Sequence, residues 1–214
     1  MMGGVRVGLL GTDAAALGGG DDVDDVLGGG DPPRTLGVHA PDAMSTGKIE
    51  YVSKNWDPDG AEVTYYDVSG TTIDQVAAAL QRIGAKWGHG GGTLKLDIPA
   101  DFSTSHTVTL SARLGLQLPQ WKQYEQARDP EKVAWNRMFR KLRQHEDGHV
   151  EIAVAAAAKL AEDLIGQTTA QALKMLDAAV RRMKDSQKKL DDATDHGARP
   201  GVKYGDVILD LAGT

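Results

Sequence analysis

The amino-acid sequence predicts an α+β domain in which a small, mostly antiparallel sheet packs on a long helix and on the antiparallel helical hairpin formed by this helix and the next. Strand-like segments gather between residues 49 and 118, and apolar residues then recur at helical spacing up to about residue 190. Strands followed by helices are typical of the α+β class. With 214 residues, 41% of them hydrophobic and 25% charged, the chain has the composition of a globular protein.

The N-terminal segment differs in composition from the rest of the chain. Residues 1–47 are rich in Gly, Asp and Ala, and the sequence Gly-Gly-Gly-Asp occurs at 18–21 and again at 28–31. Such a composition is typical of a flexible segment. We therefore expect a flexible segment over residues 1–47 and a folded domain over residues 48–214.

The strands and the first helix are predicted from periodicity and turn residues. Segments 49–53 and 62–68 contain β-branched and aromatic residues and are separated by a turn sequence, Asp-Pro-Asp-Gly. Helical spacing of apolar residues predicts a helix over 72–83. Segment 93–98 alternates, and in 108–118 every second residue is apolar, as in a half-buried strand.

Two long helices follow. Asp129, Pro130 and Glu131 suit a first helical turn, because Asp can cap, Pro fits the first position and Glu complements the helix dipole. An apolar stripe then continues to near Gly166 through Trp135, Met138, Leu142, His145, His149, Ile152, Ala156 and Leu160. Thr168 begins a capping-box sequence for the second helix, and the short connection predicts an antiparallel hairpin.

The first long helix contains the motif His-Glu-x-x-His, made of His145, Glu146 and His149. Residues four apart lie on one helix face, so both imidazoles can bind one Zn²⁺ ion. Glu146 lies about 100° around the helix from His145 and can act as the general base on a metal-activated water. Both histidines lie on the apolar stripe, which makes a buried metal site the favoured interpretation over two hydrogen-bonded core histidines.

A catalytic zinc needs a third protein ligand. The extended motif with a third histidine six residues after His149 is absent, because Ala155 occupies that position. A helical hairpin brings the end of the second helix back past the first, which makes His196 the favoured third ligand. Asp192 and Asp195 are the alternatives, as ligands or as acceptors for an imidazole N–H.

The remaining sequence features limit the class of protein. There is no cysteine, so a disulfide framework, a thiolate metal site and a Cys nucleophile are excluded. A net charge of −6 argues against nucleic acid as the main partner. No segment is long and apolar enough to predict a membrane span, and the apolar stretch at 5–10 is a poor signal peptide, which leaves a cytoplasmic and an exported location both open. Tyr204 is a weaker candidate for stabilising a tetrahedral oxyanion.

The helix containing the motif, together with the sequence Thr194–Gly197 and the segment Tyr66–Gly70, resembles a bacterial family of expected zinc-dependent proteases, domain of unknown function 922. The resemblance covers roughly residues 61–205. It implies a zincin-like α+β fold, zinc on His145 and His149, Glu146 as base and His196 as third ligand. The chain departs from the family pattern at Leu190, where the family has an aromatic residue.

These observations predict a zinc-dependent peptidase that acts on a protein or peptide substrate. By analogy with zincin folds, we expect the strand 108–118 to pair with an extended substrate by β-augmentation. The alternative is a non-enzymatic protein-interaction module with a structural or vestigial zinc site. An intact Glu146 favours the enzyme, because a structural site needs no base.

Overall fold

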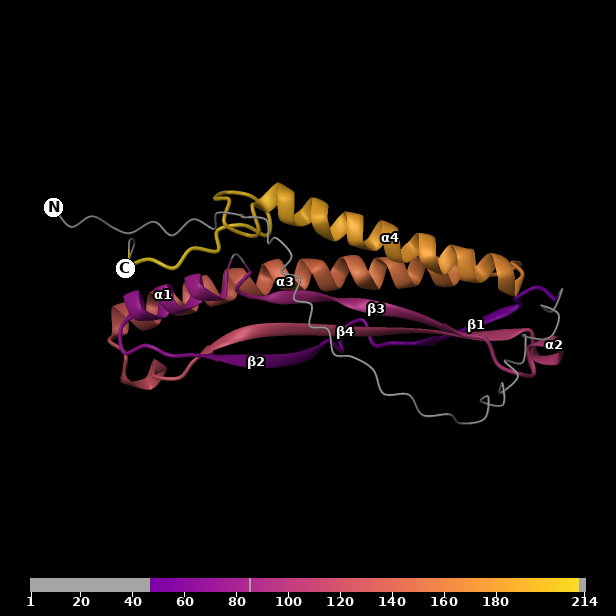
Figure 1. Cartoon of the computed structure of the whole chain (residues 1–214), viewed down its shortest axis with the longest axis horizontal. Coiled ribbons are helices and arrows are strands. Elements are labelled where there is room, and N and C mark those ends of the chain that lie inside the picture. Colours follow the sequence, from indigo (N-terminus) through magenta and orange to yellow (C-terminus); the bar gives the residue numbers. More distant parts are fainter. Residues whose placement is uncertain (1–46, 85, 212–214) are drawn as a thin grey trace, which may run out of the picture.

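The computed structural model describes residues 47–84 and 86–211, so the expected flexible segment lies outside the described residues except for Gly47. Figure 1 shows two layers, with two long helices lying along one face of an elongated sheet. The elements are β1 (Tyr51–Asn55), β2 (Glu62–Val68), α1 (Ile73–Ile83), β3 (His89–Asp97), α2 (Phe102–Ser105), β4 (Thr107–Trp121), η1 (Tyr124–Gln126), α3 (Asp129–Asp163) and α4 (Thr169–Thr194).

The sheet corrects the predicted fold class, because it is not mostly antiparallel. Along the path β1-β4-β2 every pairing is parallel, and β3 pairs antiparallel with the other edge of β4. β4 has 15 residues, long enough to pair with β1 through residues 107–111 and with β2 through 115–121 on one edge. β1 and β2 therefore lie end to end along β4 instead of pairing with each other. Alternating apolar residues indicate which face of a strand is buried but not the direction of its neighbour.

The position of β4 also contradicts the prediction that the strand 108–118 pairs with an extended substrate. Residues 108–118 lie inside β4, which pairs with β1 and β2 along one edge and with β3 along the other, so this strand is not the edge strand that the prediction requires. Among the described strands, β3 pairs only with β4 and is the edge strand nearest the long helices. The alternation itself is confirmed, since the apolar positions of β4 are buried: Val108, Leu110, Ala112, Leu114, Leu116 and Leu118.

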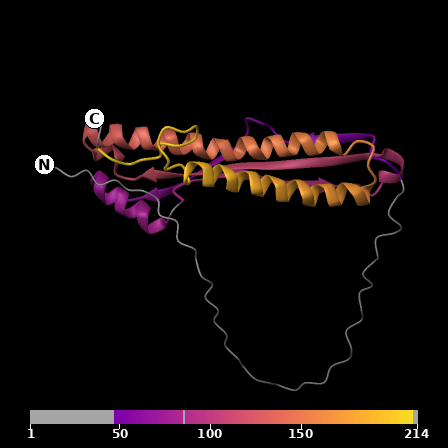
Figure 2. The same cartoon turned by 90° about the horizontal axis from the view of Figure 1, so that it is seen from above.

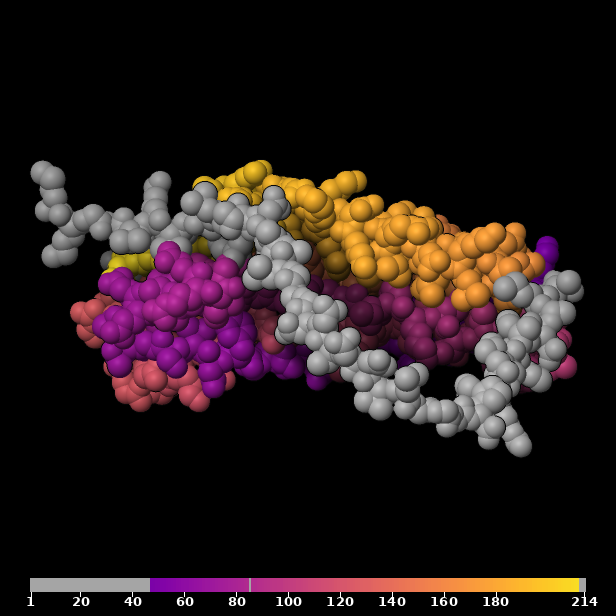
Figure 3. All heavy atoms as spheres, viewed as in Figure 1, coloured from indigo at the N-terminus to yellow at the C-terminus, as the bar shows by residue number. Residues whose placement is uncertain are grey.

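The helical hairpin is confirmed. α3 and α4 run antiparallel side by side over the sheet (Figures 1 and 2), and α3 contacts both β3 and β4. Gly166 takes a φ of 79° in the connection, and the Thr168 hydroxyl and Gln171 form the expected capping box. In Figure 3 the yellow-orange surface of α4 forms a ridge above the strands. None of the helices in the described residues has an apolar stretch that would span a membrane.

The hydrophobic core forms three clusters along the length of the molecule. One surrounds Trp87, Trp121 and Trp135, another lies at the opposite end around Phe102, and the middle one lies between β4 and α3. The central part of α3 is therefore held against the sheet on one side and against α4 on another, and the sequence motif lies on this central part.

Candidate metal centre

The two histidines of the motif lie on the buried side of α3. His145 is 2% exposed, Glu146 5% and His149 7%, so even the charged member of the motif is buried. The Nε2 atoms of His145 and His149 are 3.3 Å apart. The four-residue spacing thus brings both imidazoles together, as the sequence predicts.

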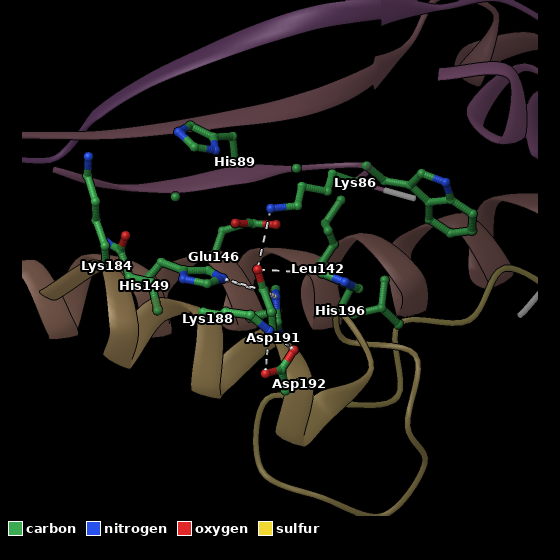
Figure 4. A pocket seen from close by; sticks show the side chains of 16 residues that line it. Lys86, His89, Leu142, Glu146, His149, Lys184, Lys188, Asp191, Asp192 and His196 are labelled. Carbon is green, nitrogen blue, oxygen red and sulfur yellow. Dashed lines mark hydrogen bonds and ion pairs between the residues drawn. The ribbon is translucent and has the colours of Figure 1, made fainter. Parts of the chain in front are cut away.

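The third member of the cluster is Asp191, from the last turns of α4. Its Oδ1 lies 3.3 Å from His145 Nε2 and 3.0 Å from His149 Nε2. One atom from each residue lies within 4.8 Å of the other two, which makes a group able to hold a metal ion. In Figure 4 the Asp191 carboxylate points from α4 toward the imidazoles of α3.

The hydrogen bonding of His145 favours a cation in this cluster. His145 Nδ1 lies 3.0 Å from the Tyr204 carbonyl oxygen, which can only accept, so Nδ1 must carry a proton. In the neutral imidazole, Nε2 is then an acceptor, and it faces Asp191 Oδ1, which is also an acceptor. A proton or a metal ion must lie between them, and two imidazole nitrogens with one carboxylate oxygen suit Zn²⁺.

The pKa shifts follow from this close packing of charges. Burial alone raises the pKa of Asp191, but hydrogen bonds from His145 and His149 outweigh it and hold that pKa well below its usual range. Burial opposes protonation of His145, yet the hydrogen bond to Asp191 and the charge of Glu146 raise its pKa overall. Asp191 is therefore ionised and available as a ligand at neutral pH.

Glu146 lies beside the cluster, under the backbone of β3. Burial raises the pKa of Glu146, opposed by the charges of the two imidazoles, and the Gly90 N–H donates to its carboxylate. A Cβ atom on Gly88 would lie 2.6 Å from Glu146 Oε1, and one on Gly90 would lie 2.2 Å from the Glu146 carbonyl oxygen. Glycine at both positions thus lets the start of β3 and the residue before it lie directly on Glu146. A carboxylate with a raised pKa next to a candidate metal suits general-base chemistry.

These groups line a pocket of about 390 Å³ between α3, α4 and the segment from Lys86 to Gly90. Ligand pockets in proteins typically measure about 300–1,000 Å³, so the space fits a short stretch of peptide or a small molecule. Figure 4 shows the cluster at the centre, with Lys184 beyond His149 on one side and His196 on the other.

His196 lies in the same pocket but in a different relation to the cluster. It follows α4 with a φ of 51°, and its Nδ1 is 3.5 Å from Asp191 Oδ2 and makes no hydrogen bond. Its role as third ligand stays a prediction, with Asp191 now a competing ligand. Asp192 pairs with Lys188 at 2.7 Å and is largely exposed, and Asp195 is exposed.

Asp191 is the residue that sequence reasoning missed, although a signal for it existed. Ala179, Met183, Gln187 and Asp191 follow each other at four-residue steps, and the first two are buried against the rest of the fold. Continuing this stripe selects Asp191 over Asp192, which is rotated by about 100° toward solvent. The tail after α4 contributes a second missed contact, because the Tyr204 backbone carbonyl orients His145.

Tyr204 itself does not line the pocket. Its hydroxyl donates to the Glu151 carboxylate, and its ring contacts the position of Gly148, where an added Cβ would lie 3.1 Å from the ring. Gly148 is therefore closely packed by this ring and by Leu190. The structure gives Tyr204 a packing role and a carbonyl that holds an imidazole, not a hydroxyl directed at the cluster.

Comparison with known proteins gives a family but no characterised relative. No curated protein and no solved structure matches the chain. A family described as a bacterial protein of unknown function, DUF922, matches residues 63–197, a range that includes the histidine motif, Asp191 and His196. The chain therefore belongs to the bacterial family DUF922, as the sequence resemblance indicates, while the zinc-dependent protease activity that the resemblance implies stays a prediction.

Proposed function

We propose that this protein is a zinc-dependent peptidase with Glu146 as general base. The observation that carries the proposal is the buried Glu146 carboxylate beside His145, His149 and Asp191 in one pocket. Zinc, when bound there, supplies a Lewis acid that acidifies a water molecule and polarises a carbonyl group.

The residues of the chain have separate tasks in this mechanism. His145 and His149 hold the metal, with His145 oriented by the Tyr204 carbonyl, and Asp191 or His196 completes the ligand set. Glu146 accepts a proton from the attacking water and passes it to the leaving amine. Burial raises the pKa of Glu146, which makes its carboxylate a stronger proton acceptor.

The arrangement favours an enzyme over an interaction module. A structural zinc site is closed by four protein ligands, whereas three ligands leave a position for water or substrate. The described residues bring three metal-binding side chains within 4.8 Å of one another and put a pocket next to them. Burial of the ionisable Glu146 carboxylate also costs free energy, and a purely structural zinc site does not need this carboxylate.

The substitution Glu146→Gln tests the proposal. The amide keeps the size of the side chain but cannot take a proton, so zinc content and fold should persist while hydrolysis of an unfolded protein such as casein falls about 10²–10⁴-fold. Glu162→Gln is the matched control, because Glu162 is exposed near the end of the same helix.

The wild-type protein must show cleavage that stops with a chelator and returns with zinc. Equal cleavage by the Glu146→Gln protein would refute the assigned base. A zinc-loaded wild type that cleaves no member of a broad panel of unfolded substrates would favour the interaction module.

A further inference from the structure

The α4 wall of the pocket has a regular arrangement of charge. Lys184, Gln187, Lys188 and Asp191 line the pocket at helical positions i, i+3, i+4 and i+7, so one face of α4 is turned toward the metal cluster. Lys86 lines the pocket from the segment before β3. Three lysines thus surround a site on a chain whose net charge is −6.

Two of these lysines are already paired. Lys86 Nζ lies 3.4 Å from Asp191 Oδ2, and Lys188 Nζ lies 2.7 Å from Asp192 Oδ2. The Lys184 side chain has no ion pair or hydrogen bond with any residue that the structure describes. In Figure 4 its side chain extends from α4 toward the level of β3, past His149. The Lys184 ammonium is therefore the cation in the pocket that is available to a ligand.

The balance of charge in the pocket is positive once the metal is present. The three lysines are matched by the carboxylates of Glu146, Asp191 and Asp192, so a divalent ion leaves an excess of positive charge. A pocket with such an excess attracts anionic ligands and disfavours cationic ones. The apolar Leu142 lies next to His196, on the other side of the cluster from Lys184.

We propose, resting on the peptidase function above, that the substrate is an acidic peptide segment and that Lys184 binds an Asp or Glu side chain close to the scissile bond. An exposed ion pair contributes at most about 1 kcal/mol, equivalent to roughly five-fold in affinity. Because the attraction passes partly through solvent, it weakens as the salt concentration rises.

Peptide binding to the zinc-loaded Glu146→Gln protein tests this proposal without requiring turnover. The probes are three sets of fluorescent decapeptides made of Ala, Gly and Ser. In each set a single residue, which is Glu, Gln or Lys, is placed at each position in turn. We expect the best Glu peptide to bind roughly five-fold more tightly than its Gln counterpart at low salt, and the Lys peptide to bind most weakly. Adding Lys184→Ala should remove the difference between Glu and Gln, and Lys184→Glu should reverse the order of Glu and Lys.

Lys189→Ala is the matched control, because Lys189 is exposed on the same helix and does not line the pocket. The control should keep the preference for Glu. Equal affinity for Glu and Gln peptides, or an unchanged preference in the Lys184→Ala protein, would overturn the acidic specificity while leaving the peptidase proposal standing. Binding of no peptide at all to the zinc-loaded protein would overturn both proposals.

Discussion

Replacing Asp191 by Asn separates the two candidates for the third metal ligand. Asp191 Oδ1 lies 3.0 Å from His149 Nε2, whereas His196 reaches the cluster only through Asp191 Oδ2, at 3.5 Å. If Asp191 binds the metal, the substitution removes an anionic ligand. Without metal, the amide N–H groups of Asn can donate to the imidazole nitrogens, so the metal-free fold should persist.

The size of the effect follows from binding linkage. At a free zinc concentration about 100 times the dissociation constant, zinc stabilises the wild type by about 2.7 kcal/mol, which raises Tm by roughly 5–11 °C for a domain of this size. Loss of a ligand should weaken binding by at least about 100-fold, since even residues that only orient a ligand contribute 10–100-fold. At the same zinc concentration the stabilisation then falls to about 0.4 kcal/mol, a shift of less than about 2 °C.

Thermal unfolding by circular dichroism, with and without zinc and after treatment with a chelator, measures this shift. Asp192→Asn is the matched control, because the neighbouring carboxylate is largely exposed and, among the described residues, pairs with Lys188 alone. Its zinc-dependent shift should equal that of the wild type. A full shift in the Asp191→Asn protein, together with its loss in the His196→Ala protein, would refute the assignment and identify His196 as the ligand.

Two further predictions concern the packing around the site. Gly90→Ala should destabilise the protein by about 1–3 kcal/mol and weaken zinc binding, because the added Cβ would lie 2.2 Å from the Glu146 carbonyl oxygen; urea unfolding and zinc titration measure both effects. Glu131→Gln should destabilise by about 1–3 kcal/mol, because the buried Glu131 carboxylate accepts the backbone N–H groups of Ile73 and Arg128 and joins the starts of α1 and α3. The Arg128 side chain, followed by these backbone bonds, lowers the pKa of Glu131 to about 2, so its stabilisation is complete above about pH 4.5 and disappears as the pH falls through about 2.

Each of these variants has a control within the chain. A Cβ at Gly115 in β4 would meet no atom closer than 3.7 Å, so Gly115→Ala should leave stability and zinc binding nearly unchanged. Glu125 is exposed and 3.9 Å from Lys132, so Glu125→Gln should have little effect. An Ala at Gly90 as harmless as one at Gly115 would contradict the close approach of β3 to α3. A Glu131→Gln penalty that stays constant from pH 7 to pH 2 would contradict the lowered pKa.

Local patterns in the sequence determined the helices, most of the strands and the pair of histidines. These features depend on residues only a few positions apart, so helical spacing places His145 and His149 on one face and the Thr168 capping box begins α4, both as predicted. The same local reasoning made Glu146 the candidate base, since its place follows from the helix alone.

Only the tertiary structure decided how the segments meet. The direction of β1 and β2 beside β4 depends on how the chain connects them, and an alternating pattern looks the same in either direction. The helical stripe indicates which side of α4 is buried, but only the packing of α4 on α3 brings Asp191 to His145 and His149. Gly90 and Glu146 are in contact although they are 56 positions apart in the sequence. No local sequence pattern indicates that the backbones of two such distant segments come together.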